Sequence, residues 1–160
     1  MGKKKKREAK TVNSFKSAVE KTPDIAPCFQ AGLQALGKHS KKIELEETLL
    51  CSGSVDIDAC TTAKYPQSSR WDYALCYKSE VFFVEVHTAN TREVTAVLNK
   101  LKWLKDWLNA QAPEINKLKA KSQSPFIWLQ SNNFKLLGGS KQYKAAIQAG
   151  IKPMAKLTLK

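Results

Sequence analysis

Two segments near the middle of the chain, residues 70–77 and 81–87, have the apolar content and the alternation of β-strands. The link between them is so short that the chain must reverse direction there, which predicts a β-hairpin. The Lys-Ser dipeptide of the link is not typical of two-residue hairpin turns, so a four-residue loop from Tyr77 to Glu80 is favoured. Either of these loop lengths pairs the two strands in the same register.

In this register Asp72 lies directly opposite Glu85. Directly opposite residues have Cβ atoms about 4.5–5.5 Å apart, and like charges at that separation repel each other unless a cation or a proton intervenes. His87 shares a face with Glu85, because side chains alternate between the two faces of a strand. The hairpin therefore predicts a metal site. A three-residue loop would instead turn Asp72 to the other face of the sheet.

The segments that precede the hairpin predict two helices and two further strands. Apolar residues recur at helical spacing over residues 11–21, and a second helical stripe runs over residues 24–37. Alternation predicts a strand over residues 43–51, for which a helix is the alternative, then a turn at residues 52–54 and a strand over residues 55–60.

The segments after the hairpin predict a helical crossover. A long amphipathic helix is expected between Glu93 and Pro113, and residues 126–130 form an apolar run typical of a buried parallel strand. These elements make a β-α-β unit. A short helix over residues 140–149 and a final strand over residues 154–159 complete the chain. We expect an α/β fold with a central mixed β-sheet flanked by helices and with N-terminal helices.

Length and composition fit one folded domain, residues 11–160, preceded by a basic flexible arm, residues 1–10. The chain has 160 residues, of which 42% are hydrophobic. No apolar run approaches the length of about 18 residues that crosses a bilayer, so no membrane partner is expected. The expected location is the cytoplasm, or the nucleus if the source is eukaryotic.

Four cysteines offer disulfides or a zinc site as alternatives to free thiols. They are not spaced as Cys-x-x-Cys, and their neighbours are apolar or strand-like. We therefore expect free thiols, buried or half-buried, at Cys28, Cys51, Cys60 and Cys76.

The net charge of +13 is spread unevenly along the chain. Residues 99–160 carry +10 and residues 1–10 carry +5, which leaves −2 for residues 11–98, where the carboxylate pair lies. Lysines that neutralise phosphates release condensed counterions, so this distribution favours DNA or RNA as the partner. A solubilising role is the alternative. The arm would contact phosphates through Lys3, Lys4, Lys5, Lys6 and Arg7.

Two tryptophans one turn apart, Trp103 and Trp107, lie beside the apolar stripe of the long predicted helix. Their expected place is the core or its margin, and stacking on exposed bases is the alternative. Asp56 and Asp58 share a face if their segment is a strand. They would then either join the metal site or form a solvated edge.

The order of these elements over residues 40–131 resembles the PD-(D/E)xK phosphodiesterase superfamily, which has the restriction-endonuclease-like fold. In that family an Asp on one strand and a Glu on the next bind Mg²⁺, and a Lys two residues after the Glu helps to activate water. Asp72 and Glu85 match the two acidic positions. The chain departs from the family at His87, which stands in place of the Lys.

The resemblance implies several roles for His87: general base, ligand of a metal such as Mn²⁺, or mark of an inactive site. A purely structural role is the alternative that the residue type itself suggests. In some members the Lys comes from another element, which makes Arg92 or Lys100 a candidate. Some members also add an acidic residue from an N-terminal helix, to which Glu20 would correspond.

The leading hypothesis is a nuclease that depends on Mg²⁺ or Mn²⁺ and cleaves phosphodiester bonds in DNA or RNA. Its catalytic residues would be Asp72, Glu85 and His87, with the metal held by the two carboxylates and the nucleic acid contacted by the arm, Arg92 and Lys100. The alternative is a catalytically inactive nucleic-acid-binding or interaction module on the same fold. A homodimer or a subunit of a larger nuclease or defence complex is a further alternative.

Overall fold

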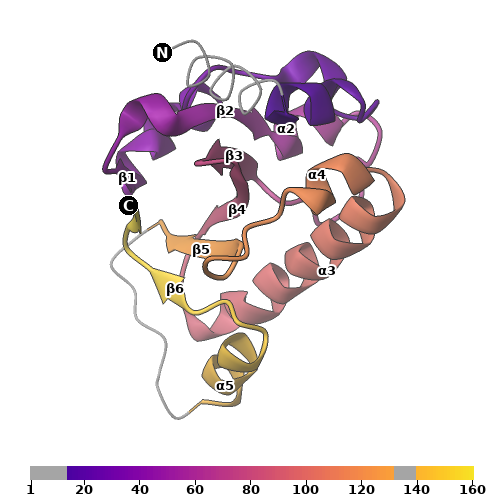
Figure 1. Cartoon of the computed structure of the whole chain (residues 1–160). Coiled ribbons are helices and arrows are strands. Elements are labelled where there is room, and N and C mark those ends of the chain that lie inside the picture. Colours follow the sequence, from indigo (N-terminus) through magenta and orange to yellow (C-terminus); the bar gives the residue numbers. More distant parts are fainter. Residues whose placement is uncertain (1–13, 132–139) are drawn as a thin grey trace.

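The structure is a computed structural model that describes residues 14–131 and 140–160. The predicted basic arm, with Lys3 to Arg7, lies outside the described residues. The described part is a mixed α/β fold built on a five-stranded mixed sheet that helices flank (Figure 1). The coarse fold class expected from the sequence is thus confirmed.

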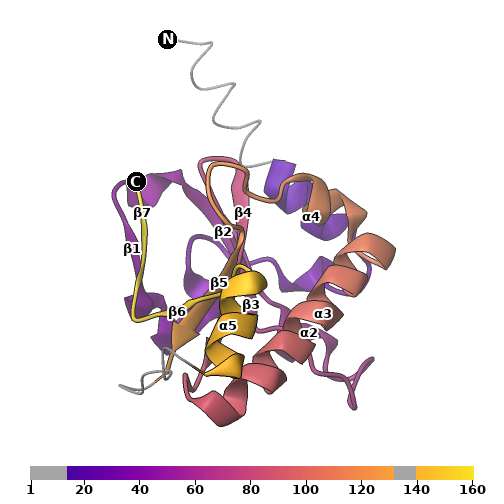
Figure 2. The ribbon, with the colours of Figure 1, turned by 90° about the horizontal axis from the view of Figure 1, so that it is seen from below.

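The five strands lie in the spatial order β2-β3-β4-β5-β6. Their bounds are β2 (Cys51–Asp56), β3 (Tyr73–Tyr77), β4 (Glu80–His87), β5 (Phe126–Gln130) and β6 (Pro153–Met154). β3 is antiparallel to both of its neighbours, β2 and β4, whereas β4, β5 and β6 run parallel to one another. A second, parallel pair is formed by β1 (Ile43–Leu45) and β7 (Leu157–Leu159). Figure 2 shows this pair on one side of the main sheet and two helices, α3 and α4, on the other.

The hairpin of β3 and β4 has the predicted register, in which Tyr77 pairs with Glu80 and Ala74 with Phe83. The expected four-residue loop is wrong, because only Lys78 and Ser79 lie outside the strands. Both residues have positive φ angles, 49° and 70°. Two successive residues in this region form a turn whose twist matches that of the strands. This match outweighs the cost of a left-handed backbone at two non-glycine residues.

The predicted crossover is confirmed. After β4 the chain forms η4 (Thr91–Glu93), α3 (Val94–Ala110) and α4 (Pro113–Lys117), and β5 then lies parallel to β4. One face of α3 is buried against the sheet, and Pro113 begins α4 rather than ending α3. The buried residues of α3 are Val94, Val97, Leu101, Leu104, Trp107 and Leu108.

Two apolar cores cover the two faces of the sheet. On the side of α3, Phe83 and Trp128 belong to the larger core. On the other side, Leu75, Phe82 and Leu129 pack with residues of the β1-β7 pair. Alternate residues of the central strands therefore contribute to both cores, which explains why these strands are apolar on both faces.

The first predicted helix is present over residues 14–20, but the second, over residues 24–37, is wrong. Its place is taken by two short 3₁₀ segments, η1 (Ala26–Cys28) and η2 (Gln34–Lys42). Gly32 and Gly37 have φ angles of 51° and 52°, a conformation that glycine adopts freely and that interrupts a helix.

The boundaries predicted over residues 43–60 are also wrong. β1 is short and is followed by η3 (Thr48–Leu50), while β2 runs through the predicted turn. A Cβ at Gly53 would lie 2.3 Å from a ring carbon of Phe29, so this glycine serves a close contact within a strand. The strand predicted over residues 55–60 is largely replaced by α2 (Ile57–Thr61), because Asp56 caps it by accepting a hydrogen bond from Ala59 N.

The last helix, α5 (Lys141–Gln148), is confirmed, whereas the final strand is divided into β6 and β7 in two different sheets. The expectation of four free cysteines is wrong for two of them. Cys28 and Cys60 form a disulfide between η1 and α2, and Cys51 and Cys76 are free and buried. The bonded cysteines are separated by 32 positions in the sequence and form no recognisable spacing pattern, which is why the sequence does not predict the bond.

Candidate active site

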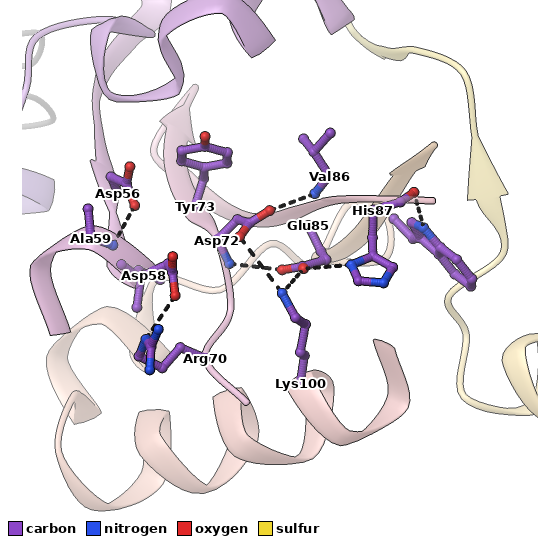
Figure 3. Close-up of polar contacts among 12 residues, drawn as sticks. Asp56, Asp58, Ala59, Arg70, Asp72, Tyr73, Glu85, Val86, His87 and Lys100 are labelled. Carbon is purple, nitrogen blue, oxygen red and sulfur yellow. Dashed lines mark hydrogen bonds and ion pairs between the residues drawn. The ribbon is translucent and has the colours of Figure 1, made fainter. Parts of the chain in front are cut away.

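Asp72 and Glu85 meet as the hairpin register predicts, and each carboxylate is held by the other residue's strand. Asp72 N donates to Glu85 Oε2 at 2.9 Å, and Val86 N donates to Asp72 Oδ2 at 3.0 Å (Figure 3). These two bonds continue the hairpin beyond the end of its backbone ladder. One oxygen of each carboxylate, Asp72 Oδ1 and Glu85 Oε1, is left free of the strands.

Both free oxygens face the ammonium group of Lys100 on α3. Lys100 Nζ is in direct contact with Glu85 Oε1 and lies 4.0 Å from Asp72 Oδ1. Figure 3 shows the lysine rising from the helix toward the pair. The Glu85 side chain is fully buried, and a buried charge needs such a partner. Arg92, the other candidate, is exposed on η4, and no ion pair joins it to these carboxylates within residues 14–131.

Crowding of the two acids shifts the protonation of Asp72. Burial, followed by the charge of Glu85, raises the pKa of Asp72 to about 7, although Lys100 acts in the opposite direction. Burial by itself lowers the pKa of Lys100, but the Glu85 and Asp72 carboxylates outweigh it and raise this pKa above its ordinary value. One lysine therefore compensates only part of the repulsion between the two carboxylates.

His87 lies between the carboxylates of Glu85 and Glu93. Its Nε2 is 2.8 Å from Glu93 Oε2, and its Nδ1 is 3.7 Å from Glu85 Oε1. The Glu85 carboxylate has the largest effect and raises the pKa of His87. Burial acts in the opposite direction, and the hydrogen bond with Glu93 raises this pKa further. Trp128 Nε1 donates to the His87 carbonyl at 3.0 Å and fixes the end of β4.

Glu93 is a site residue for which the sequence predicts only the start of a helix. Asn90 caps this segment, because its side chain accepts a hydrogen bond from Glu93 N. The signal that would have found it is positional: the capped turn directly after β4 returns the chain toward His87, the last residue of that strand. The helix start and the strand end therefore share one edge of the sheet.

Asp56 and Asp58 do not share a strand face. Asp56 ends β2 and caps α2, whereas Asp58 lies in the first turn of α2 and forms an ion pair with Arg70 Nε at 2.8 Å. Asp58 nevertheless contributes to the negative potential that raises the pKa of Asp72. Glu20 is exposed on the helix of residues 14–20.

The two tryptophans lie at the margin of the core, as expected. Trp107 is buried, and its ring is nearly parallel to that of Trp103, with centroids 5.7 Å apart and an angle of 10°. Tyr65 contacts Trp103 edge-on. The Trp107 indole donates to Asp24 Oδ2 at 3.0 Å. These contacts account for both side chains without a ligand.

The donor set at the hairpin fits a hard cation in one respect: an oxygen of each of two carboxylates faces the same positive group. Within residues 14–131 and 140–160, no group of three or more His, Cys, Asp or Glu side chains is arranged to hold a metal ion. A cation bound here would have Asp72 and Glu85 as its protein side-chain ligands. Mg²⁺ commonly binds through one or two carboxylates together with waters and substrate phosphates.

In comparisons with protein-family models, curated proteins and solved structures, no match to this chain is found. The functional assignment therefore depends on the geometry of the site. Among the helices of the described residues, none is long and apolar enough to cross a membrane.

Proposed function

We propose that the protein is a nuclease that depends on a divalent cation, Mg²⁺ or Mn²⁺, and hydrolyses phosphodiester bonds in DNA or RNA. One observation carries the proposal: Asp72 and Glu85 bind each other's strands and direct their remaining oxygens to one positive group. The order of elements also supports it. An Asp-bearing strand, a Glu-bearing strand, a long helix and a parallel strand follow each other as the resemblance to the PD-(D/E)xK superfamily implies.

Asp72 and Glu85 would hold the cation, which when bound polarises the scissile phosphate and lowers the pKa of a coordinated water. Both carboxylates must be ionised for this task. Because the pKa of Asp72 is about 7 without a cation, binding would release a proton from part of the molecules at neutral pH. Cation affinity should therefore increase as the pH rises through neutrality.

Lys100 supplies the ammonium group that the resemblance places two residues after the Glu. It comes from α3, yet it reaches the free oxygens of both acids. An ammonium there would stabilise negative charge that develops on the phosphate during attack. The departure from the motif at His87 thus has a compensating residue in the same site.

His87 is assigned a positioning role rather than that of general base. Its raised pKa favours the imidazolium form, which has no lone pair to accept a proton. Placed between Glu93 and Glu85, it orients the Glu85 carboxylate. Replacing His87 with Gln should therefore weaken cation binding and leave the slope of the pH-rate profile nearly unchanged.

The test is cleavage of supercoiled plasmid and of single-stranded RNA with Mg²⁺ or Mn²⁺. Asp72→Asn, Glu85→Gln and Lys100→Ala should each lower the cleavage rate at least about a hundredfold, since each removes a charged group of the site. Lys102→Ala is the matched control, because Lys102 is an exposed lysine of the same helix. Absence of cleavage by the unmodified protein under all these conditions would contradict the proposal.

A second readout does not depend on turnover. A ligand that binds only the folded state raises the melting temperature, so Mn²⁺ should stabilise the unmodified protein and not Asp72→Asn. Equal shifts for the two proteins would place the cation elsewhere.

The alternative function, an inactive nucleic-acid-binding module, also has an observation in its favour. The contact of Lys100 with Glu85 already provides the buried acid with a cation. If that pairing is purely structural, Asp72→Asn and Glu85→Gln change stability and leave nucleic-acid binding unaltered, and no divalent cation shifts the melting temperature.

A further inference from the structure

The last turn of η2 lies at the same edge of the sheet as the candidate site, on the face opposite α3. His39 Nδ1 is 3.0 Å from the hydroxyl of Tyr73, the residue after Asp72. Lys42 Nζ donates to the carbonyl of Gln130 at 3.0 Å, and Gln130 pairs with His87 across β4 and β5. Tyr73 points away from Lys100 (Figure 3). The strand edge with the carboxylates is thus flanked by α3 on one face and by η2 on the other.

A glycine directs the chain into this position. Gly37 has φ 52° and ψ −126°, which interrupts the helical path within η2, and only glycine adopts this region freely. The side chains on either side of the segment of residues 38–42 are anchored, because Leu36 and Ile43 are buried in the core beneath the β1-β7 pair. The segment is therefore held at both ends against the sheet.

This segment carries positive charge without matching acids. Lys38 and Lys41 are exposed. No ion pair involves Lys38, Lys41 or Lys42 in the part of the chain that the structure describes, and Lys42 bonds only to a backbone carbonyl there. The positive charge also affects His39. Burial has the largest effect and lowers the pKa of His39, and the charges of Lys38 and Lys42 lower it further, whereas Asp56 acts in the opposite direction.

We propose that Lys38, Lys41 and Lys42 bind backbone phosphates of the nucleic-acid strand that occupies the candidate site. The inference depends on the proposed function in that the strand is the substrate, and it adds to that function a second segment that binds the same strand. A strand that spans both the carboxylates and η2 is a polynucleotide, not a free mononucleotide. Lysine contacts to phosphate set position and affinity but carry no sequence information, so binding at this segment is independent of base sequence.

The test compares two double variants with the same change in net charge. Lys38→Gln with Lys41→Gln removes two charges from η2, and Lys141→Gln with Lys144→Gln removes two from α5, where both lysines are also exposed. Binding of a short fluorescent oligonucleotide, single-stranded or duplex, is measured by anisotropy in EDTA, so that no cleavage takes place. A mononucleotide serves as the competitor that lacks a chain.

The η2 variant should lose about tenfold or more in affinity at moderate salt, and the plot of log K against log salt should become shallower by about 0.7 to 0.9 per lost phosphate contact. The α5 variant should change much less, and the mononucleotide should not compete. Equal losses for the two variants, an unchanged η2 variant, or no oligonucleotide binding by the unmodified protein would overturn the inference.

Failure of this inference can be told apart from failure of the nuclease proposal. If the unmodified protein cleaves and the η2 variant binds normally, only the role of η2 is wrong. If the protein never cleaves but the η2 variant binds weakly, the segment binds nucleic acid and the catalytic assignment is wrong.

Discussion

Two acidic residues of this protein, Asp24 and Asp72, are both partly buried and have opposite surroundings. The Asp24 side chain is 4% exposed and accepts hydrogen bonds from Lys64 Nζ and Tyr65 OH, both at 2.6 Å, and from Trp107 Nε1 at 3.0 Å. The Asp72 side chain is 20% exposed. It accepts one backbone hydrogen bond, faces Lys100 at 4.0 Å and adjoins a second carboxylate.

The difference in surroundings appears in the pKa values of the two carboxyl groups. Burial by itself raises the pKa of Asp24, but its three donors outweigh it and hold this pKa below the ordinary value. At Asp72 burial and the neighbouring Glu85 prevail, and the pKa rises to about 7. A carboxylate supplied with donors is a structural element, whereas Asp72, which remains short of positive charge, is the carboxylate to which the proposed function assigns a cation.

The largest effect is expected when the chain around Asp24 loses its covalent cross-link. The disulfide between Cys28 and Cys60 ties η1, which begins two residues after Asp24, to α2 and closes a loop with a sequence separation of 32. Replacing both cysteines with Ser should lower the free energy of unfolding by about 3 to 4 kcal/mol, because the unfolded chain gains freedom. Urea denaturation at neutral pH measures this loss.

The same double variant should keep the melting shift that Mn²⁺ produces, since the disulfide contributes no atom to the hairpin site. A reducing agent should destabilise the unmodified protein and leave the variant unchanged. Identical unfolding curves of the unmodified protein with and without reductant would show that the disulfide contributes nothing to the free energy of unfolding.

The next effect concerns Asp24 itself. Asp24→Ala leaves the Trp107 indole and the Tyr65 hydroxyl without their acceptor, and we expect a loss of about 3 kcal/mol in unfolding free energy. Asp24→Asn keeps one acceptor and should cost less. Asp106→Ala is the control, because Asp106 is exposed on the same helix as Trp107 and should change stability by no more than about 0.5 kcal/mol. Equal effects of the two alanine variants would contradict the structural role of Asp24.

What the sequence predicts well in this protein is local. Asp72 and Glu85 are only 13 positions apart in the sequence, and their meeting follows from a short reversal and the strict alternation of side chains. The crossover to β5 follows from one strongly periodic helix. Lys100 was one of two candidates, because periodicity locates a residue on a helix face but does not say at which turn the helix crosses the carboxylates.

What the sequence does not predict depends on distant partners. Asp24 has the residue type and position of a helix cap, but its donors Lys64 and Trp107 are 40 and 83 residues away. The strand assignments around Gly53 fail because this glycine serves a close contact with Phe29 rather than a turn. Tertiary contacts thus override local propensity in much of the segment of residues 24–60.

The smallest predicted effect has the opposite sign to that at Asp24. Because the pKa of Asp72 in the folded protein is about 7, above its ordinary value, the folded state holds this proton more tightly than the unfolded state does. Stability should therefore fall as the pH rises from about 4 to about 7.

In EDTA, Asp72→Asn removes this dependence and should be more stable than the unmodified protein by about 1 to 2 kcal/mol above neutral pH, with the gain vanishing toward pH 4. Asn can still accept the hydrogen bond from Val86 N. Urea denaturation at several pH values measures the difference, and a variant less stable than the unmodified protein at every pH would mean that Asp72, like Asp24, is a structural anion.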